Sequence, residues 1–364
     1  MNPKSAIKGR GAQRNVPNRF FELSHEIRDD FLEFCQKEGE ESDKNKTLYL
    51  EVFPKTIVNK VESSDVGMSY SMNAYQGCEH GCIYCYARNS HEFWGYSAGL
   101  DFERRIMIKK DAPKLLEALL KKKSWKAHPI VMSGNTDCYQ PAEKEFKITR
   151  QCLEIFLKYK HPVAIITKNA LILRDLDLLK VLAKDNLIAV NMSITSLSED
   201  TRRVLEPRTA TIKRRLETVK VLSENGIPVN VMLAPIIPSI NSHEILPLAK
   251  AASNHGALSI AHTIVRLNGA IGEIFSDWIY KTMPDRAEKV LHQIESCHGG
   301  NLNDSRYGTR MHGEGKIAEQ INNLVKLARQ KYFKGKRMPK LNCDLHEPYK
   351  IGQLRLFKSK KVSK

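Results

Sequence analysis

Short apolar runs rich in β-branched residues alternate with longer amphipathic segments along most of the chain. Strands are expected at Tyr70–Tyr75, His128–Met132, Val163–Thr167, Leu187–Thr195, Val229–Ala234 and Leu258–Val265. Helical periodicity follows them at Ala112–Lys122, Lys147–Lys158, Arg174–Ala183, Lys213–Asn225 and His243–His255. This alternation predicts parallel βα units, and six units are too few to close an eight-stranded barrel. We therefore predict an α/β fold, an open six-unit (β/α) barrel with N- and C-terminal extensions.

The same pattern divides the chain into four parts. Residues 1–65 form a basic and then acidic N-terminal extension, 66–270 the barrel core, 271–335 a helical C-terminal extension and 336–364 a basic tail. In the acidic segment Phe21–Asp43, the apolar positions indicate one short, peripheral helix. The helix around Trp278 and the segment 317–333 are expected to close the open side of the barrel.

Charge is concentrated at the two ends of the chain. The 364 residues include 58 Lys+Arg and 41 Asp+Glu, which gives a formal net charge of +17. Residues 1–20 contribute +5 and residues 331–364 contribute +9, so +3 remains between them. Basic ends of this kind are typical of nucleic-acid arms or of solvated, solubilising tails. No apolar stretch is long enough for a membrane span or a secretory signal, so we expect a soluble, cytoplasmic protein with no membrane partner.

Three of the eight cysteines lie close together directly after the first expected strand. Cys78, Cys82 and Cys85 follow a CxxxCxxC spacing. Three thiolates can hold three irons of a 4Fe-4S cluster and leave the fourth iron open. A zinc site would need a fourth ligand, such as His80 or His91, and usually combines two separated cysteine pairs. The spacing favours the iron–sulfur cluster over zinc or over buried free thiols.

This spacing, with Tyr84 just before the third cysteine, resembles the radical S-adenosylmethionine (radical SAM) enzymes. The resemblance implies a partial TIM barrel, a 4Fe-4S cluster and S-adenosyl-L-methionine bound to the open iron. It also implies an electron donor such as flavodoxin or ferredoxin. One electron then splits the cofactor into methionine and a 5′-deoxyadenosyl radical, which abstracts a hydrogen atom.

The carboxyl ends of the other expected strands carry candidate cofactor-binding residues, because active sites of such barrels lie at that edge. Asp137, with Thr136, is the acid available for the cofactor's ammonium group, unless the segment is only a turn. Lys168 and Arg208 suit its carboxylate, although a solvated lysine and a helix-start arginine are the plainer interpretations. Further candidates are Ser193 and Thr195 for the ribose or carboxylate, and Ala234, Pro235 and the backbone of Tyr84 for the adenine.

Several stretches resemble one branch of this family, the proteins related to spore photoproduct lyase. They are Lys8–Gly11, Tyr75–Arg88, Asn135–Pro141, Leu173–Asp177, Leu205–Arg208 and Asp304–Arg310. The lyase reverses a thymine photoproduct in DNA, and one of its cysteines returns a hydrogen atom to the product. Cys138 lies in the corresponding region, but Gly134 matches that cysteine's position better. Cys138 is therefore a candidate hydrogen donor or a packing residue.

The leading hypothesis is a radical enzyme acting on a DNA base, in the manner of a repair lyase. A base must leave the helical stack to reach such a site, and Tyr84, Tyr86, Phe93, Trp94 and Tyr139 are candidates for stacking on it. Alternatives are an RNA, protein or small-metabolite substrate, or a non-catalytic iron–sulfur protein for interaction or redox sensing. Near the C-terminus, Gln353, Leu354, Leu356 and Phe357 resemble the peptide that docks on the DNA sliding clamp. A tail packed on its own barrel is the other interpretation of that segment.

Overall fold

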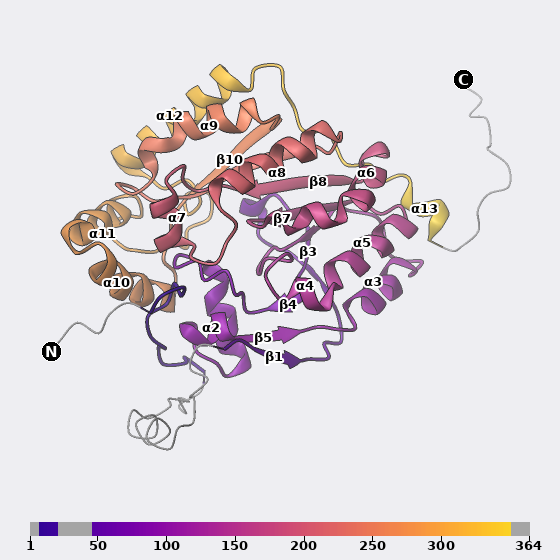
Figure 1. Cartoon of the computed structure of the whole chain (residues 1–364), viewed down its shortest axis with the longest axis horizontal. Helices are drawn as coiled ribbons and strands as arrows, with labels where there is room; N and C mark the ends of the chain where they lie inside the picture. The colour runs from indigo at the N-terminus through magenta and orange to yellow at the C-terminus, as the bar shows by residue number, and fades with distance from the viewer. Residues whose placement is uncertain (1–6, 21–45, 351–364) are drawn as a thin grey trace.

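A seven-stranded sheet forms the centre of the molecule (Figure 1). The computed structural model describes residues 7–20 and 46–350. The strand order is β10-β9-β8-β7-β6-β3-β2. The bounds are β2 (Val58–Lys60), β3 (Tyr70–Met72), β6 (Ile130–Met132), β7 (Val163–Thr167), β8 (Ile188–Ser193), β9 (Val229–Ile236) and β10 (Ser259–Ile264). The six strands from β3 to β10 are parallel, and only β2 pairs antiparallel. The predicted six-unit α/β architecture is confirmed.

The helices that connect these strands bury one apolar side against the sheet. They are α3 (Ala112–Leu120), α4 (Glu143–Phe146), α5 (Ile148–Lys158), α6 (Leu176–Lys184), α7 (Glu199–Leu205), α8 (Ile212–Glu224) and α9 (Ile245–Asn254). In α5, the buried residues Ile148, Cys152, Leu153 and Phe156 recur at helical spacing. Burying each large apolar side chain contributes about 1.5–3 kcal/mol. The helix expected from Arg174 begins at Leu176, because Ala170–Asp175 forms the 3₁₀ helix η3.

A second, three-stranded sheet that sequence reasoning missed lies beside the barrel. Its order is β1-β5-β4, with β1 (Leu48–Glu51), β5 (Arg105–Ile108) and β4 (Tyr75–Gln76), and α2 (Leu100–Arg104) precedes β5. The strand expected at Tyr70–Tyr75 is therefore two strands in two sheets. At the break, the side chain of Asn73 accepts hydrogen bonds from the backbone N–H of Asn135 at 2.9 Å and Thr136 at 3.2 Å.

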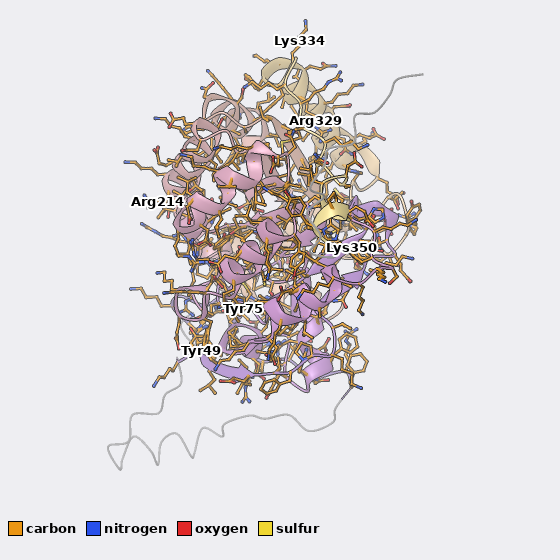
Figure 2. All side chains as sticks on the ribbon, turned by 90° about the vertical axis from the view of Figure 1, so that its right-hand side faces the viewer. Tyr49, Tyr75, Arg214, Arg329, Lys334 and Lys350 are labelled. Atoms are coloured by element: carbon orange, nitrogen blue, oxygen red, sulfur yellow. The ribbon has the colours of Figure 1, made fainter. Side chains whose placement is uncertain are left out.

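The C-terminal extension consists of α10 (Ala270–Thr282), α11 (Ala287–Ser296) and α12 (Gly315–Tyr332). Trp278 is buried on α10, and α12 packs against α9 (Figure 1). The following segment is not only a tail, because residues up to Lys350 contact the barrel and α13 (His346–Tyr349) ends there (Figure 2). His346 donates from Nδ1 to the carbonyl of Tyr159 at 2.8 Å, and Lys350 donates to that of Lys123 at 2.8 Å.

Two predicted features lie outside the described residues: the peripheral helix within Phe21–Asp43 and the motif Gln353–Phe357. Within the described ranges, no helix combines the length and the apolar character needed to cross a lipid bilayer.

Candidate functional site

Cys78, Cys82 and Cys85 lie in the loop between β4 and the 3₁₀ helix η2 (Tyr86–Trp94). All three are free thiols; Cys78 and Cys82 are buried and Cys85 is half-buried. Burial raises the pKa of Cys78, and the charges of Asp137, Cys82 and Cys85 raise it further. Burial also raises the pKa of Cys82, to about 12, although Lys168 acts in the opposite direction. The three thiols therefore lie within electrostatic reach of one another, at the carboxyl edge of the large sheet.

The cysteine loop, residues 77–85, requires two glycines. Gly77 and Gly81 have φ angles of +80° and +68°, a region that disfavours side chains. A Cβ at Gly77 would lie 2.8 Å from the carbonyl oxygen of Arg105, and one at Gly81 would lie 2.9 Å from Glu103 Oε2. The loop therefore passes too close to α2 and β5 for larger residues.

The N-terminal segment, residues 7–20, covers the cysteine loop. Arg88 donates to the carbonyl of Cys82 at 3.0 Å and pairs with Glu103 at 2.6 Å, both fully buried. Glu103 also accepts the backbone N–H of Gly11 at 3.2 Å and of Ala12 at 2.8 Å. Gly11 has no room for a side chain, because its Cβ would lie 1.8 Å from the carbonyl oxygen of Gly81. Residues 7–20 are therefore part of the site's framework, which their charge pattern did not reveal.

The donor set fits an iron–sulfur cluster better than a zinc ion. Among the described residues, no three or more His, Cys, Asp or Glu side chains are arranged to hold one metal ion. Zinc ligands must converge on one point, whereas each cysteine of a 4Fe-4S cluster binds a different iron. His80 contacts Asp137 at 3.3 Å and Asn169 at 3.1 Å, and His91 is buried among Tyr96 and Phe102. Both ring nitrogens of His80 thus already have partners in the protein, and the ring of His91 packs against aromatic side chains.

Asp137 connects the ends of three segments. Its carboxylate accepts hydrogen bonds from the Thr167 hydroxyl at 2.8 Å, the Lys168 backbone at 2.8 Å and the Tyr139 backbone at 2.9 Å. Burial favours the neutral acid, but His80 and these donors hold the pKa of Asp137 below its usual value. Thr136 donates to the carbonyl of Tyr75 at 2.7 Å. The contacts of both residues are within the protein, and their predicted role in binding the cofactor stays a prediction.

Lys168 lies at the same mouth as the cysteines. Its ammonium is 5.9 Å from the centre of the Tyr84 ring. Burial lowers the pKa of Lys168, but its interactions with Cys82 and Glu206 outweigh burial and raise it. A lysine held charged beside Glu206 and the cysteine loop suits an anionic group bound there.

A buried network that the sequence did not indicate holds Tyr84 and the end of β8. Glu206 accepts hydrogen bonds from the Tyr84 hydroxyl, from Thr195 at 2.8 Å and from Arg215 at 2.5 Å. Burial opposes its charge, yet Arg215 and Lys168 lower the pKa of Glu206 to about 2. Glu206 lies in the Leu205–Arg208 stretch of the resemblance, which was the only signal for it.

The remaining predicted cofactor residues cluster at the ends of β8 and β9. Arg215 donates to the carbonyl of Ser193 at 3.1 Å. Asn241 donates to the carbonyls of Thr195 at 2.7 Å and Pro235 at 3.1 Å, and Ala234 precedes that proline at the end of β9. The backbone of Arg208 donates to the carbonyl of His80 at 3.2 Å, which places this arginine against the cysteine loop.

Cys138 is buried in the main hydrophobic core. Its backbone N–H donates to Ser133 Oγ at 2.7 Å, and its carbonyl accepts the Thr149 hydroxyl at 2.6 Å. Burial raises the pKa of its thiol. This placement favours a packing role, and the predicted role as a hydrogen donor stays a prediction.

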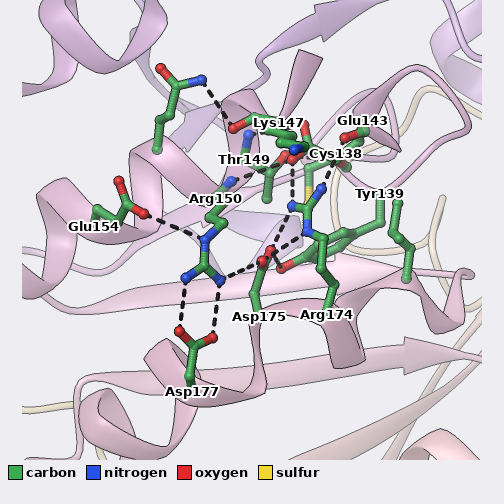
Figure 3. A network of polar contacts seen from close by, with 12 residues as sticks. Cys138, Tyr139, Glu143, Lys147, Thr149, Arg150, Glu154, Arg174, Asp175 and Asp177 are labelled. Carbon is green, nitrogen blue, oxygen red and sulfur yellow. Dashed lines mark hydrogen bonds and ion pairs between the residues drawn. The ribbon is translucent and has the colours of Figure 1, made fainter. Parts of the chain in front are cut away.

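A polar network supports the loop that carries Cys138 and Tyr139 (Figure 3). Arg174 pairs with Glu143 at 2.7 Å and with Asp175 at 2.8 Å. Asp175 also accepts the Tyr139 hydroxyl at 3.0 Å and pairs with Arg150 at 3.0 Å. The Leu173–Asp177 stretch of the resemblance is thus a structural support of the loop after β6.

The candidate stacking residues divide into two groups. Tyr84 and Tyr139 are buried, whereas Tyr86, Phe93 and Trp94 on η2 are 52%, 69% and 43% exposed. Tyr86 directly follows Cys85 and donates its hydroxyl to the carbonyl of Gly134, after β6. Among the three exposed aromatic residues, Tyr86 therefore lies beside both the cysteine loop and the loop after β6.

Comparison with known proteins agrees with this geometry. Residues 72–252, about half of the chain, match the model of the Radical SAM superfamily. Two relatives, both uncharacterized proteins, come from Mycobacterium tuberculosis and Methanocaldococcus jannaschii. The first is 28% identical over 65% of this chain and 70% of its own length. The second is 34% identical over 48% of this chain and 62% of its own length.

Among solved structures, spore photoproduct lyase shares the fold. A variant with bound AdoMet and dinucleoside spore photoproduct has a TM-score of 0.59 at 14% identity, over 84% of this chain and 92% of that chain. Another variant gives a TM-score of 0.59 at 14% identity over 79% and 80% of the two chains. The radical SAM identity, the lyase-like architecture and the partial barrel predicted from the sequence are confirmed.

Proposed function

We propose that this protein is a radical SAM enzyme in which Cys78, Cys82 and Cys85 hold a 4Fe-4S cluster, and that it takes a hydrogen atom from a nucleic-acid base, as in a DNA repair lyase. The observation that carries the first part is the group of three free thiols on a glycine-shaped loop at the carboxyl edge of the barrel. When bound, the cluster and S-adenosyl-L-methionine supply a 5′-deoxyadenosyl radical after uptake of one electron.

The surrounding residues bind and orient the cofactor in this proposal. Lys168 and Arg208 place positive charge for its carboxylate, and Asp137 with Thr136 positions the strand ends near its ammonium group. Ser193, Thr195, Ala234, Pro235 and the Tyr84 backbone border the ribose and adenine. The Glu206–Arg215 pair holds Tyr84, and therefore the cysteine loop, in register with β8.

Anaerobic reconstitution tests the chemistry. With iron, sulfide, S-adenosyl-L-methionine and a chemical reductant, wild type should form 5′-deoxyadenosine. Cys82→Ala should bind less iron and lose this product, whereas Cys343→Ala, a half-buried cysteine far along the chain, should keep both. Normal 5′-deoxyadenosine formation by Cys82→Ala would contradict the assignment.

The nucleic-acid part of the proposal is supported by the exposed Tyr86 beside the cysteine loop. Stacking of one base on an aromatic ring contributes about 1–3 kcal/mol. We expect Tyr86→Ala to weaken binding of a single-stranded oligonucleotide at least fivefold, while Tyr86→Phe, which keeps the ring, binds like wild type. Equal losses in the two variants would contradict stacking.

The class of substrate is tested by measuring which deuterated molecule transfers deuterium to 5′-deoxyadenosine. DNA containing deuterated bases, photodamaged or intact, should deliver deuterium to 5′-deoxyadenosine as seen by mass spectrometry. Transfer from RNA of the same sequence, from a peptide or from a small metabolite instead would replace DNA as the substrate. If the cofactor is not cleaved under any of these conditions, the non-catalytic iron–sulfur alternative is favoured.

We also propose a cytoplasmic location and two partners. One is an electron donor such as flavodoxin or ferredoxin. The other is the DNA sliding clamp, bound through Gln353, Leu354, Leu356 and Phe357 as apolar anchors and a hydrogen-bonding handle. Deleting residues 353–357 should abolish co-purification with the clamp, and deleting residues 360–364 should not. Retention of the clamp by the first deletion would refute this docking.

A further inference from the structure

A groove on the C-terminal extension is separate from the cysteine loop. It has a volume of about 750 Å³ and lies between α11, α12 and the loop that follows β9. Figure 1 shows α11 and α12 on the side of the barrel formed by α9 and β10. Ile317, Ile321 and Leu324 of α12 give it an apolar wall. Its size is in the usual range for ligand sites, about 300–1,000 Å³.

The ionisable residues that line the groove are all basic. His243, Arg286 and Lys289 line it, and no Asp or Glu does. Asp285 and Glu288 are neighbours of these residues in sequence but are absent from the lining. Arg286 and Lys289 are exposed and form no ion pair with any described residue, and His243 is 3.8 Å from Glu244. Arg286 and Lys289 therefore bring positive charge to the groove, and neither has a carboxylate at ion-pair distance within the described ranges.

Neutral polar groups complete the lining. Ser239 and Gln293 both border the groove, and the Ser239 hydroxyl donates to Gln293 Oε1 at 2.7 Å. This bond occupies the amide oxygen, so the NH₂ group of Gln293 remains as a donor for an anionic ligand. Ser239 has a φ angle of +61°, an uncommon conformation for a residue with a side chain.

The groove continues along α12 instead of ending as a closed pocket. A second hollow of about 410 Å³ shares Gln320 and Leu324 with it and extends to Leu327. Ile317 and Leu327 are separated by ten residues of helix, or about 15 Å at 1.5 Å per residue. An elongated ligand fits this shape better than a compact one.

A run of basic residues follows the groove. From residue 326 to residue 340 the chain has seven bases and no acid: Lys326, Arg329, Lys331, Lys334, Lys336, Arg337 and Lys340. All seven are exposed, and in the described part of the chain none of them pairs with a carboxylate. Figure 2 shows Arg329 and Lys334 together at one end of the molecule. Basic residues gathered along a helix are the electrostatic footprint of nucleic-acid binding.

We propose that the α11–α12 groove and the basic run 326–340 bind the backbone of a single nucleic-acid strand, outside the radical site. Arg286 and Lys289 contact phosphates, and Ile317, Ile321 and Leu324 contact sugars and bases. This inference rests on the proposed action on nucleic acid, and it assigns to the C-terminal extension the task of holding the strand. Exposed basic residues release counterions when they bind phosphates, so binding through this surface depends strongly on salt.

A matched pair of triple variants tests the proposal. The groove variant carries Arg286→Gln, Lys289→Gln and Lys326→Gln. The control variant carries Lys180→Gln, Lys213→Gln and Arg214→Gln, which removes three exposed charges from the outer helices α6 and α8. Binding of a fluorescent single-stranded DNA oligonucleotide is measured by anisotropy over a series of salt concentrations, with full-length reconstituted protein.

We expect the groove variant to bind at least tenfold more weakly than wild type. The slope of log affinity against log salt should fall by about 2–3, because each lost phosphate contact removes about 0.7–0.9 from the slope. The control variant should lose less than one unit of slope. Equal loss in both variants, or displacement of DNA by polyglutamate at equal charge concentration, would overturn the proposal.

A measurement of cofactor cleavage distinguishes failure of the groove proposal from failure of the proposed radical chemistry. Formation of 5′-deoxyadenosine without substrate should be unchanged in the groove variant, since none of its three positions lies in the cysteine loop. A wild-type protein that forms 5′-deoxyadenosine but binds neither single-stranded nor duplex DNA overturns the groove assignment and leaves the radical chemistry in place. Tighter binding of duplex than of single strands overturns the choice of a single strand.

Discussion

His91 is a buried histidine whose ring nitrogens have no hydrogen-bond partner among the described residues. Its ring packs edge-on against Phe102, with centroids 5.6 Å apart. Burial lowers the pKa of His91 to about 3, whereas an unfolded histidine titrates near 6.5. The unfolded chain therefore binds more protons between these values, and stability is lost as pH falls from about 6.5 toward 3.

We expect His91→Phe to stabilise the protein more at pH 5 than at pH 8. The stabilisation at pH 5 should exceed that at pH 8 by about 2 kcal/mol. The reason is that pH 5 lies about 1.5 units below the unfolded pKa, and each pH unit contributes about 1.4 kcal/mol. Urea unfolding at the two pH values measures it, and His292→Phe, at an exposed position, is the control. A pH-independent effect of His91→Phe would show that His91 is not buried as a neutral ring.

At the residue scale, the spacing of the cysteines in the sequence predicted the candidate cluster site. It did not predict the buried polar residues that hold this site in place. Cys78, Cys82 and Cys85 share one loop, so their spacing alone predicted the site. Glu103 and Glu206 act through contacts with residues distant in the chain, Gly11 and Tyr84. Nothing in their neighbouring sequence distinguishes a buried ion pair from an exposed one.

At the scale of elements, the network of Figure 3 contains two aspartates that differ mainly in burial. Arg150 contacts both, Asp175 at 3.0 Å and Asp177 at 2.8 Å. The side chain of Asp175 is 0% exposed and that of Asp177 is 60% exposed. Asp175 connects η3 to the loop after β6 through Tyr139, whereas Asp177 only extends the network toward solvent.

We expect Asp175→Asn to lower the free energy of unfolding by about 3–5 kcal/mol, because breaking a buried pair leaves Arg174 without its full charge compensation. Asp177→Asn, which removes the exposed pair with Arg150, should cost less than about 1 kcal/mol. Denaturant unfolding of both variants measures the contrast. Similar costs at the two positions would mean that burial does not set the strength of this network.

Periodicity located the six parallel strands and their helices because each has one buried side that repeats at a fixed interval. It missed β1, β4 and β5, whose runs are two to four residues long. Such short strands are defined by pairing with one another, as in β1 with β5, and not by a pattern within each. The division of Tyr70–Tyr75 into β3 and β4 follows from that pairing.

At the scale of the whole molecule, the described parts of both charged ends contribute to the fold. Residues 7–20 close the cysteine loop, and residues 341–350 lie against the segments between the outer helices and strands. The count of charged residues predicted that both ends are solvated tails or nucleic-acid arms, because Lys and Arg side chains are usually exposed. Arg10 and Lys350 are instead buried, and each donates to backbone carbonyls.

Lys350 provides the test of whether this C-terminal contact holds the barrel together. Its ammonium donates to the carbonyls of Lys123 and Trp125, which precede β6. Lys350→Met keeps the length of the side chain but leaves these carbonyls without their donor, so we expect a loss of about 1–3 kcal/mol in the free energy of unfolding. Lys340→Met, at an exposed position of the same segment, should stay within about 0.5 kcal/mol of wild type. Equal stability of the two variants would mean that the barrel holds without this contact, and a specific loss at Lys350 would make the end of the described chain a structural part of the barrel.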